Sequence, residues 1–140
     1  IRRLVYAMRP PALDELGLVP ALQQRVASTR TPDGRPMRVV VESTDLPPLP
    51  AAIEVAAYRI ASEAVTNSAR HSGTDRASVQ IECDGDRLTI AVRDDGTSRG
   101  NWVPGVGIAS MRERAAEVGG TLEIATDGRG SLVSAHLPLA

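Results

Sequence analysis

The sequence is poor in cysteine, histidine and aromatic residues. Its 140 residues include one cysteine, Cys83, and two histidines, which excludes an intramolecular disulfide and argues against a structural zinc site. Cys83 falls in a predicted strand, where it serves as a small apolar side chain. Aromatic residues make up 2% of the chain and hydrophobic residues 42%. The core of a single domain therefore has to be built from Val, Ile, Leu and Ala.

Two further absences concern location and partners. The net charge is −1, from 16 basic and 17 acidic residues, so no general attraction to nucleic acid or to an anionic membrane is expected. No apolar run approaches the roughly 20 residues that a bilayer-spanning helix needs, and no signal peptide is visible. We expect a cytoplasmic protein, or the cytoplasmic part of a longer one, that contacts neither nucleic acid nor membrane directly.

The chain begins within a helical pattern. Apolar residues stand at positions 1, 4, 5 and 8, without a helix start signal before them. Arg9-Pro10-Pro11 ends the pattern, because proline removes a backbone donor and restricts the residue before it. We interpret residues 1–10 as the end of a helix that starts upstream, and residues 11–140 as one domain.

Hydrophobic periodicity predicts the order of the remaining elements. Helical spacing indicates helices over 13–28, 51–71 and 108–118, and alternation or β-branched residues indicate strands over 37–42, 79–83, 88–92, 121–125 and 132–137. Residues 93–107 lack periodicity and are expected to form a loop. Such a mixture of hairpins and helices favours an α+β fold. We predict a two-layer sandwich, in which a mixed, mostly antiparallel sheet is covered by helices on one face.

Three polar residues lie along the predicted helix 51–71. Glu63, Asn67 and Arg70 are spaced i, i+4 and i+7, so they fall within about 60° of one another on an α-helix. Polar groups near a core need partners, and a metal-bound polyphosphate would satisfy all three. A solvated outer face of an amphipathic helix is the alternative interpretation.

Two glycine-bearing segments follow this helix. Asp94-Asp95-Gly96 comes after the predicted strand, where a carboxylate at a pocket mouth suits a donor such as an exocyclic amine; an ordinary turn has the same pattern. Gly105 and Gly107 precede a helix, whose first backbone amides suit phosphates. A third glycine and a preceding strand are lacking, which disfavours a dinucleotide-binding unit, and no P-loop sequence occurs.

The order of these segments is more specific than any one of them. The Asn67-bearing helix, Asp-x-Gly at 94–96, Gly-x-Gly-Ile-x-x-Met-Arg-Glu-Arg at 105–114 and Gly-Arg-Gly-Ser at 128–131 resemble the catalytic ATP-binding domain of a sensor histidine kinase. That domain shares the Bergerat (GHKL) fold with gyrase B, Hsp90 and MutL. The amino-acid sequences of residues 63–72 and 8–18 are typical of the histidine kinases that act on NarL-type response regulators. The resemblance covers essentially the whole chain.

The resemblance implies ATP and Mg²⁺ as ligands and assigns roles to single residues. Asn67 would coordinate the Mg²⁺ that bridges the ATP phosphates, and Glu63 would bind a metal-bound water or orient the attacking group. Asp94 would accept a hydrogen bond from the adenine amino group, with Gly96 allowing the base to approach. The other implied contacts are Arg70 and His71 to phosphate oxygens, Gly105 and Gly107 as a lid hinge, Ile108 and Met111 along the pocket, and Ser131 beside Asp94.

The resemblance also implies partners. The domain would transfer the γ-phosphoryl group to a histidine outside this chain, because His71 lies within the ATP-binding motif and His136 within the final strand. The acceptor would belong to the protein's own dimerisation domain, and a NarL-type response regulator would act downstream. We expect a homodimer for the full-length protein and a monomer for the isolated chain.

Two alternatives have different functions. The first is a serine kinase of the same fold that binds and inhibits a sigma factor; the helical pattern at 1–9 and Met-Arg-Glu-Arg at 111–114 favour the histidine kinase over it. The second is a module that binds nucleotide only to regulate a partner. Ser98, which stands where the family has glycine, and the short segment between Gly96 and Gly105 favour this second alternative.

Overall fold

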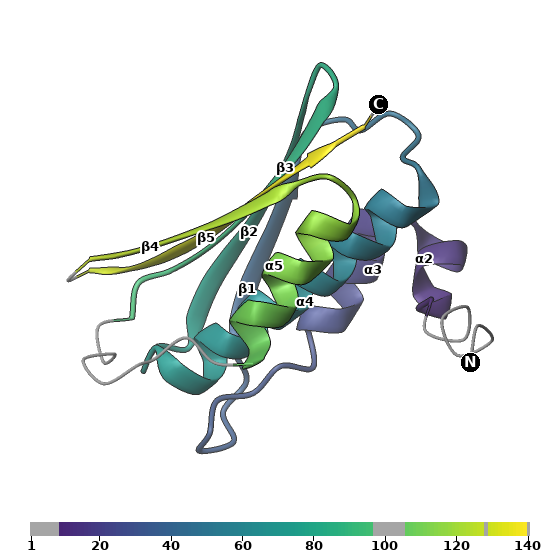
Figure 1. The fold of residues 1–140 in the computed structure, drawn as a ribbon. Coiled ribbons are helices and arrows are strands. Elements are labelled where there is room, and N and C mark those ends of the chain that lie inside the picture. The colour runs from purple at the N-terminus through teal and green to yellow at the C-terminus, as the bar shows by residue number, and fades with distance from the viewer. Residues whose placement is uncertain (1–8, 97–105, 128, 140) are drawn as a thin grey trace.

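The computed structural model of the protein describes residues 9–96, 106–127 and 129–139. Within these residues the sequence forms four helices and five strands: α2 (Pro11–Leu16), α3 (Leu18–Val26), β1 (Arg38–Ser43), α4 (Ala51–His71), β2 (Arg76–Asp84), β3 (Arg87–Asp94), α5 (Val106–Glu117), β4 (Thr121–Asp127) and β5 (Gly130–Pro138). The strands form one sheet in the order β1-β2-β3-β5-β4. Within this sheet only the β1–β2 pair is parallel. Figure 1 shows α3, α4 and α5 on one face of this sheet, so the predicted α+β sandwich is confirmed.

The core lies between the sheet and the helices. Its buried side chains are aliphatic for the most part, as the composition predicted, and helix α4 contributes a row of small ones. Small residues let α4 lie close to its neighbours α3 and α5, both of which contact it. Burial of each such Leu, Ile or Val side chain contributes about 1.5–3 kcal/mol to the free energy of folding. No helix in the described part of the chain is both long enough and apolar enough to cross a bilayer.

Apart from helix 51–71, each predicted element differs from the observed one at one end or both. Helix 51–71 has the predicted bounds, but the predicted helix 13–28 is two helices, which are separated at Gly17 (φ 83°). The expected loop 93–107 was too long at both ends. Strand β3 runs on to Asp94, and α5 begins at Val106.

The carboxylate at position 94 explains why the predicted strand 88–92 ends two residues before β3 does. Buried positions alternate with exposed or half-buried ones along this strand, and the buried ones are Leu88, Ile90, Val92 and Asp94. The strand therefore continues its alternation to its last residue, which pairs with Ser131 of β5. The apolar pattern stops two residues earlier because a carboxylate occupies the last inward-facing position.

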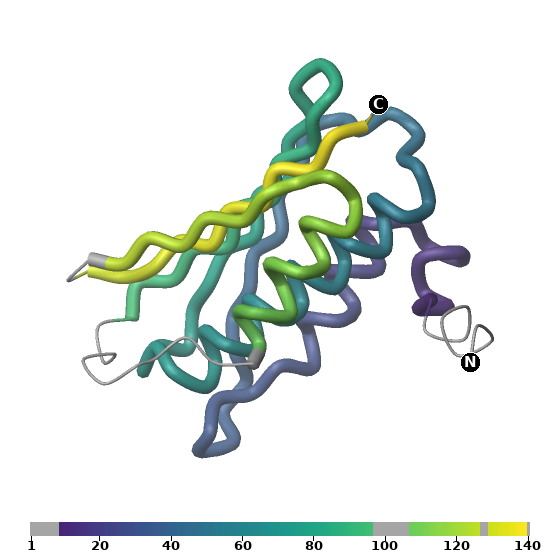
Figure 2. Tube along the Cα trace, in the orientation of Figure 1, coloured from purple at the N-terminus to yellow at the C-terminus, as the bar shows by residue number. Residues whose placement is uncertain are grey.

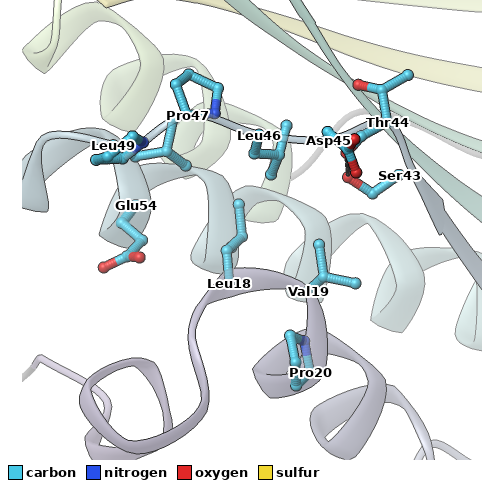
Figure 3. Close-up of a pocket in the computed structure, with 11 residues that line it drawn as sticks. Leu18, Val19, Pro20, Ser43, Thr44, Asp45, Leu46, Pro47, Leu49 and Glu54 are labelled. Carbon is cyan, nitrogen blue, oxygen red and sulfur yellow. Dashed lines mark hydrogen bonds between the residues drawn. The ribbon is translucent and has the colours of Figure 1, made fainter.

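The segment between β1 and α4 covers the start of α3. It contains Leu46 and Leu49, which are half-buried and pack on the core. Figure 3 shows Leu18 and Val19 of α3 pointing toward this segment, across a groove of about 400 Å³. At the same end of the molecule, Arg9 donates to Asp14 at 2.9 Å and to Glu54 at 3.0 Å.

The hydrogen bonds from Arg9 to Glu54 and Asp14 raise the pKa of its guanidinium group. They connect the residues before α2 to the first turn of α4. The predicted helix end at residues 1–10 lies outside the described residues, apart from Arg9 and Pro10, which are not helical.

Helices α4 and α5 lie side by side and run in opposite directions (Figure 2). The first turn of α5 is consequently next to the middle of α4. This places the predicted phosphate-binding glycine segment beside the predicted polar stripe, although about 40 residues separate them in sequence.

Candidate functional site

Asp94 is the most strongly constrained polar residue of the site. It is 5% exposed at the end of β3. Ser68 Oγ of α4 donates to Asp94 Oδ2 at 2.6 Å, and Ser131 Oγ of β5 donates to the same oxygen at 3.0 Å. The backbone N–H of Gly96 donates to Oδ1 at 3.0 Å. Donors from three segments thus stabilise a carboxylate that could not be buried without them.

Two glycines allow the backbone to close around Asp94. A Cβ atom on Gly96 would overlap the carbonyl oxygen of Ser72 and lie 2.7 Å from its carbonyl carbon. A Cβ atom on Gly130 would overlap the carbonyl oxygen of Asp94 itself. The chain after β3 therefore passes directly against the end of α4, where Ser72 is fully buried and its hydroxyl donates to the carbonyl of Ser68.

Gly96→Ala is expected to lower the free energy of unfolding by about 2–3 kcal/mol, because the added methyl meets rigid backbone rather than a movable side chain. Urea denaturation followed by circular dichroism measures the change. Gly34→Ala is the matched control: Gly34 has φ 88°, but no atom lies within 4 Å of the place that an added methyl group would occupy, so only the conformational cost of about 1 kcal/mol applies. Equal losses in the two variants would contradict the close contact at Gly96.

Glu63 and Asn67 lie one turn apart on α4, and both are half-buried. They face Gly107 in the first turn of α5. A Cβ atom on Gly107 would lie 2.7 Å from Glu63 Oε2 and 3.2 Å from Asn67 Nδ2. Among the described residues, neither of these two side chains has a hydrogen-bond or ion-pair partner. Their oxygens are therefore available to a ligand.

A small cavity of about 20 Å³ is lined by both Asn67 and Asp94. Its apolar wall includes Ile108 and Met111 of α5, which are 5% and 1% exposed. The lining residues come from α4, α5 and the strands β3, β4 and β5: Ala64, Asn67, Ser68, Asp94, Ile108, Met111, Ile124, Thr126, Ser131 and Val133. The structure thus brings together five residues that the sequence proposed for one pocket, namely Asn67, Asp94, Ile108, Met111 and Ser131.

The other predicted contacts lie around this cavity. Arg70 and His71 are exposed in the last turn of α4 and do not line it. Gly105 lies outside the described residues, as does Ser98. Gly107 lies at the start of α5, as its proposed role near phosphates requires.

The residues present fit a magnesium ion held jointly with phosphates. In the part of the chain that the structure describes, no three His, Cys, Asp or Glu side chains gather into a metal site. A Mg²⁺ bound to nucleotide phosphates needs only one or two protein oxygens, however, and keeps several waters. The side chains of Glu63 and Asn67 can supply such oxygens beside the first turn of α5.

Sequence reasoning gave no role to Ser68, Ser72 or Gly130, although Gly130 belongs to the motif at 128–131. Ser68 carried a usable signal, because a serine stands among apolar residues on the buried side of helix 51–71. A polar residue at such a position usually has a specific partner. The contacts of Ser72 and Gly130 with the segments around Asp94 depend on the tertiary arrangement, and no local pattern indicates them.

Comparison with known proteins identifies a family. Residues 52–140 match the family described as histidine kinase-, DNA gyrase B- and HSP90-like ATPase. The matched range begins at the second residue of α4 and includes every residue of the site.

Relatives and solved structures agree with this match. The chain is 31% identical to the sensor histidine kinase NarS of Mycobacterium tuberculosis, over 99% of this chain and 33% of NarS. It is 30% identical to the histidine-protein kinase/phosphatase DegS of Bacillus subtilis, over 94% of this chain and 37% of DegS. The histidine kinase domain of a blue-light activated kinase from Erythrobacter litoralis superposes with a TM-score of 0.69 at 26% identity, over 87% of this chain and 61% of that one. The chain spans about a third of the length of these curated relatives.

Proposed function

Because the chain belongs to the histidine kinase-, DNA gyrase B- and HSP90-like ATPase family, we propose that it is the ATP-binding catalytic domain of a sensor histidine kinase. It transfers the γ-phosphoryl group of ATP to a histidine outside residues 1–140. The observation that carries the proposal is the pairing of two features in one place. A buried carboxylate, Asp94, lines the cavity together with Asn67, and Glu63 lies one turn of α4 before Asn67, beside Gly107.

Asp94 suits the recognition of adenine. A carboxylate only accepts hydrogen bonds, and each of its oxygens can accept more than one. Its position is fixed by the donors on Ser68, Ser131 and Gly96, and it lines the cavity. It therefore accepts a further hydrogen bond from the exocyclic amine of the base. The apolar side chains of Ile108 and Met111 supply a surface on which the purine ring packs.

The start of α5 and the facing side of α4 suit the phosphates. The first backbone amides of α5 form an anion site, since α5 is a 12-residue helix with a positive N-terminal end. Asn67 and Glu63 would hold Mg²⁺, and the ion would supply charge neutralisation to the phosphates. Arg70 and His71, one turn further along α4, contact phosphate oxygens. Glu63 also orients the attacking histidine, and positioning of this kind is the main contribution that a kinase domain makes.

The proposal extends to the domain division, the oligomeric state and the downstream partner of the full-length protein. In this proposal, residues 11–140 are the catalytic domain and residues 1–10 are a stub of the dimerisation domain, which would carry the phosphoacceptor histidine. The full-length protein is a cytoplasmic or membrane-anchored homodimer that phosphorylates a NarL-type response regulator. The relatives that are named sensor histidine kinases support this proposal over a serine kinase that inhibits a sigma factor.

The chain is expected to bind ATP and ADP with Kd values of about 10 µM to 1 mM, more tightly with Mg²⁺ than without it. Isothermal titration calorimetry measures both affinities. With labelled ATP, the chain should phosphorylate a separately supplied acceptor domain but not itself, and it should sediment as a monomer. Absence of nucleotide binding at millimolar concentrations would refute the proposal. Binding without transfer would favour the regulatory module instead.

A further inference from the structure

A second polar pocket lies on the helical layer, beside Glu63 but outside the cavity described above. Its volume is about 170 Å³, which is enough for a carboxylate or phosphate group. Three helices each contribute one arginine to its wall: Arg25 from α3, Arg59 from α4 and Arg114 from α5. We refer to these three residues as the arginine pocket.

The arginine pocket has unbalanced positive charge. None of its three guanidinium groups has an ion pair or a hydrogen-bond acceptor among the described residues, and Arg114 does not pair with Glu113 or Glu117. Of the described residues that line the pocket, Glu63 alone is acidic. Burial, and then the neighbouring charge of Arg114, lowers the pKa of Arg59. Like charges held together in a partly desolvated place favour an anionic ligand.

Its position relates the arginine pocket to phosphoryl transfer. Glu63 lines it and at the same time faces Gly107, where the proposed phosphate site begins. An attacking histidine must come within about 3–3.5 Å of the reacting phosphorus atom. A helix that carries this histidine is about 10 Å wide, so it must lie across the surface around Glu63. Arg59 precedes Glu63 by one helical turn, which brings it under the same incoming helix.

We propose that Arg25, Arg59 and Arg114 dock carboxylate side chains of the helix that carries the phosphoacceptor histidine. This inference rests on the proposed function, and it adds the surface that brings the acceptor to the γ-phosphate. The carboxylates lie within two turns of the histidine, because the pocket is about one turn of α4 away from Glu63. The pocket sets how tightly the acceptor domain binds and leaves nucleotide binding unaffected.

The test measures acceptor binding and phosphoryl transfer separately. Arg59→Glu and Arg114→Glu should each raise the Kd for the separately supplied acceptor domain, and its KM in transfer, by about tenfold, since opposed charges are replaced by like ones. The rate at saturating acceptor and the Kd for ATP should stay within about twofold. Arg59→Gln should show a smaller increase in Kd and no loss of thermal stability, because it removes like-charge repulsion.

Arg112→Glu is the matched control. Arg112 lies on α5 two residues before Arg114, is exposed and does not line the arginine pocket. An equal effect of Arg112→Glu, or an unchanged acceptor Kd in Arg59→Glu and Arg114→Glu, would overturn the inference. Binding of inorganic phosphate that is lost in variants whose acceptor affinity is unchanged would also overturn it, since the pocket would then hold a free anion.

Failure of the proposed function is distinguishable, because the unsubstituted chain would then show no transfer at any acceptor concentration while acceptor binding can still be measured.

Discussion

Replacing Asp94 by asparagine is expected to weaken ATP and ADP binding by about 10- to 100-fold, to a similar extent with and without Mg²⁺. The substitution removes a charge-assisted hydrogen bond from the adenine amine, and such a bond contributes about 1.5–3 kcal/mol. The effect should not depend on the metal, because Asp94 is proposed to contact the base, whereas Glu63 and Asn67 of α4 are the proposed metal ligands. Calorimetric titration with ATP and ADP, each with Mg²⁺ and with a chelator, gives the four affinities that the prediction concerns.

Asparagine is preferred to alanine because three donors point at the carboxylate of Asp94. Asparagine keeps one oxygen for the N–H of Gly96, and the two serine hydroxyls can turn to accept from its amide. Alanine would leave all three donors unsatisfied and would confuse loss of binding with loss of stability.

Asp95→Asn is the control for charge alone. Asp95 is the next residue, but it is exposed and pairs with Thr74 and Arg76 rather than with the cavity. This control should leave both nucleotide affinities within about twofold of the unsubstituted chain. An equal loss in Asp94→Asn and Asp95→Asn would mean that Asp94 acts through general electrostatics and not through the base.

The candidate site could be predicted from the sequence where its residues follow local rules. Glu63 and Asn67 share a helix face whatever the rest of the fold does, because their spacing alone sets their directions. The sequence neighbours of Gly107 placed it just before a helix, and the structure has it as the second residue of α5. Composition alone also predicted the aliphatic core, and the sequence pattern of helix 51–71 predicted both of its ends.

The rest of the site depends on the order of the strands. Ser131 reaches Asp94 because β5 lies between β3 and β4, an order that differs from the order along the chain. Periodicity gives the strands and their inward faces, but it does not say which strands are neighbours. The contact between Gly96 and the carbonyl of Ser72 likewise arises from packing of the chain after β3 against the end of α4.

Asn67→Ala should reduce phosphoryl transfer to a supplied acceptor domain by about 100-fold or more, because it removes an oxygen that positions the metal and the phosphates. Unlike Asp94→Asn, it should leave metal-free ADP binding nearly unchanged and abolish most of the gain in affinity that Mg²⁺ gives. Single-turnover transfer from labelled ATP measures the first effect, and calorimetry with and without Mg²⁺ measures the second. Gln80→Ala, which removes an exposed amide from β2 on the sheet, is the control.

Gly107→Ala tests the same mechanism without touching either proposed ligand. The new methyl would lie 2.7 Å from Glu63 Oε2 and 3.2 Å from Asn67 Nδ2, and both atoms are at the ends of side chains that can move. The fold should therefore tolerate the change, and the melting temperature should stay the same or rise, since alanine favours a helix over glycine by about 1 kcal/mol. Transfer should still fall by about tenfold or more, because Glu63 and Asn67 are displaced together. If Asn67→Ala loses ADP affinity equally with and without Mg²⁺, or if Gly107→Ala transfers at the rate of the unsubstituted chain, then Glu63 and Asn67 do not hold the metal at the first turn of α5.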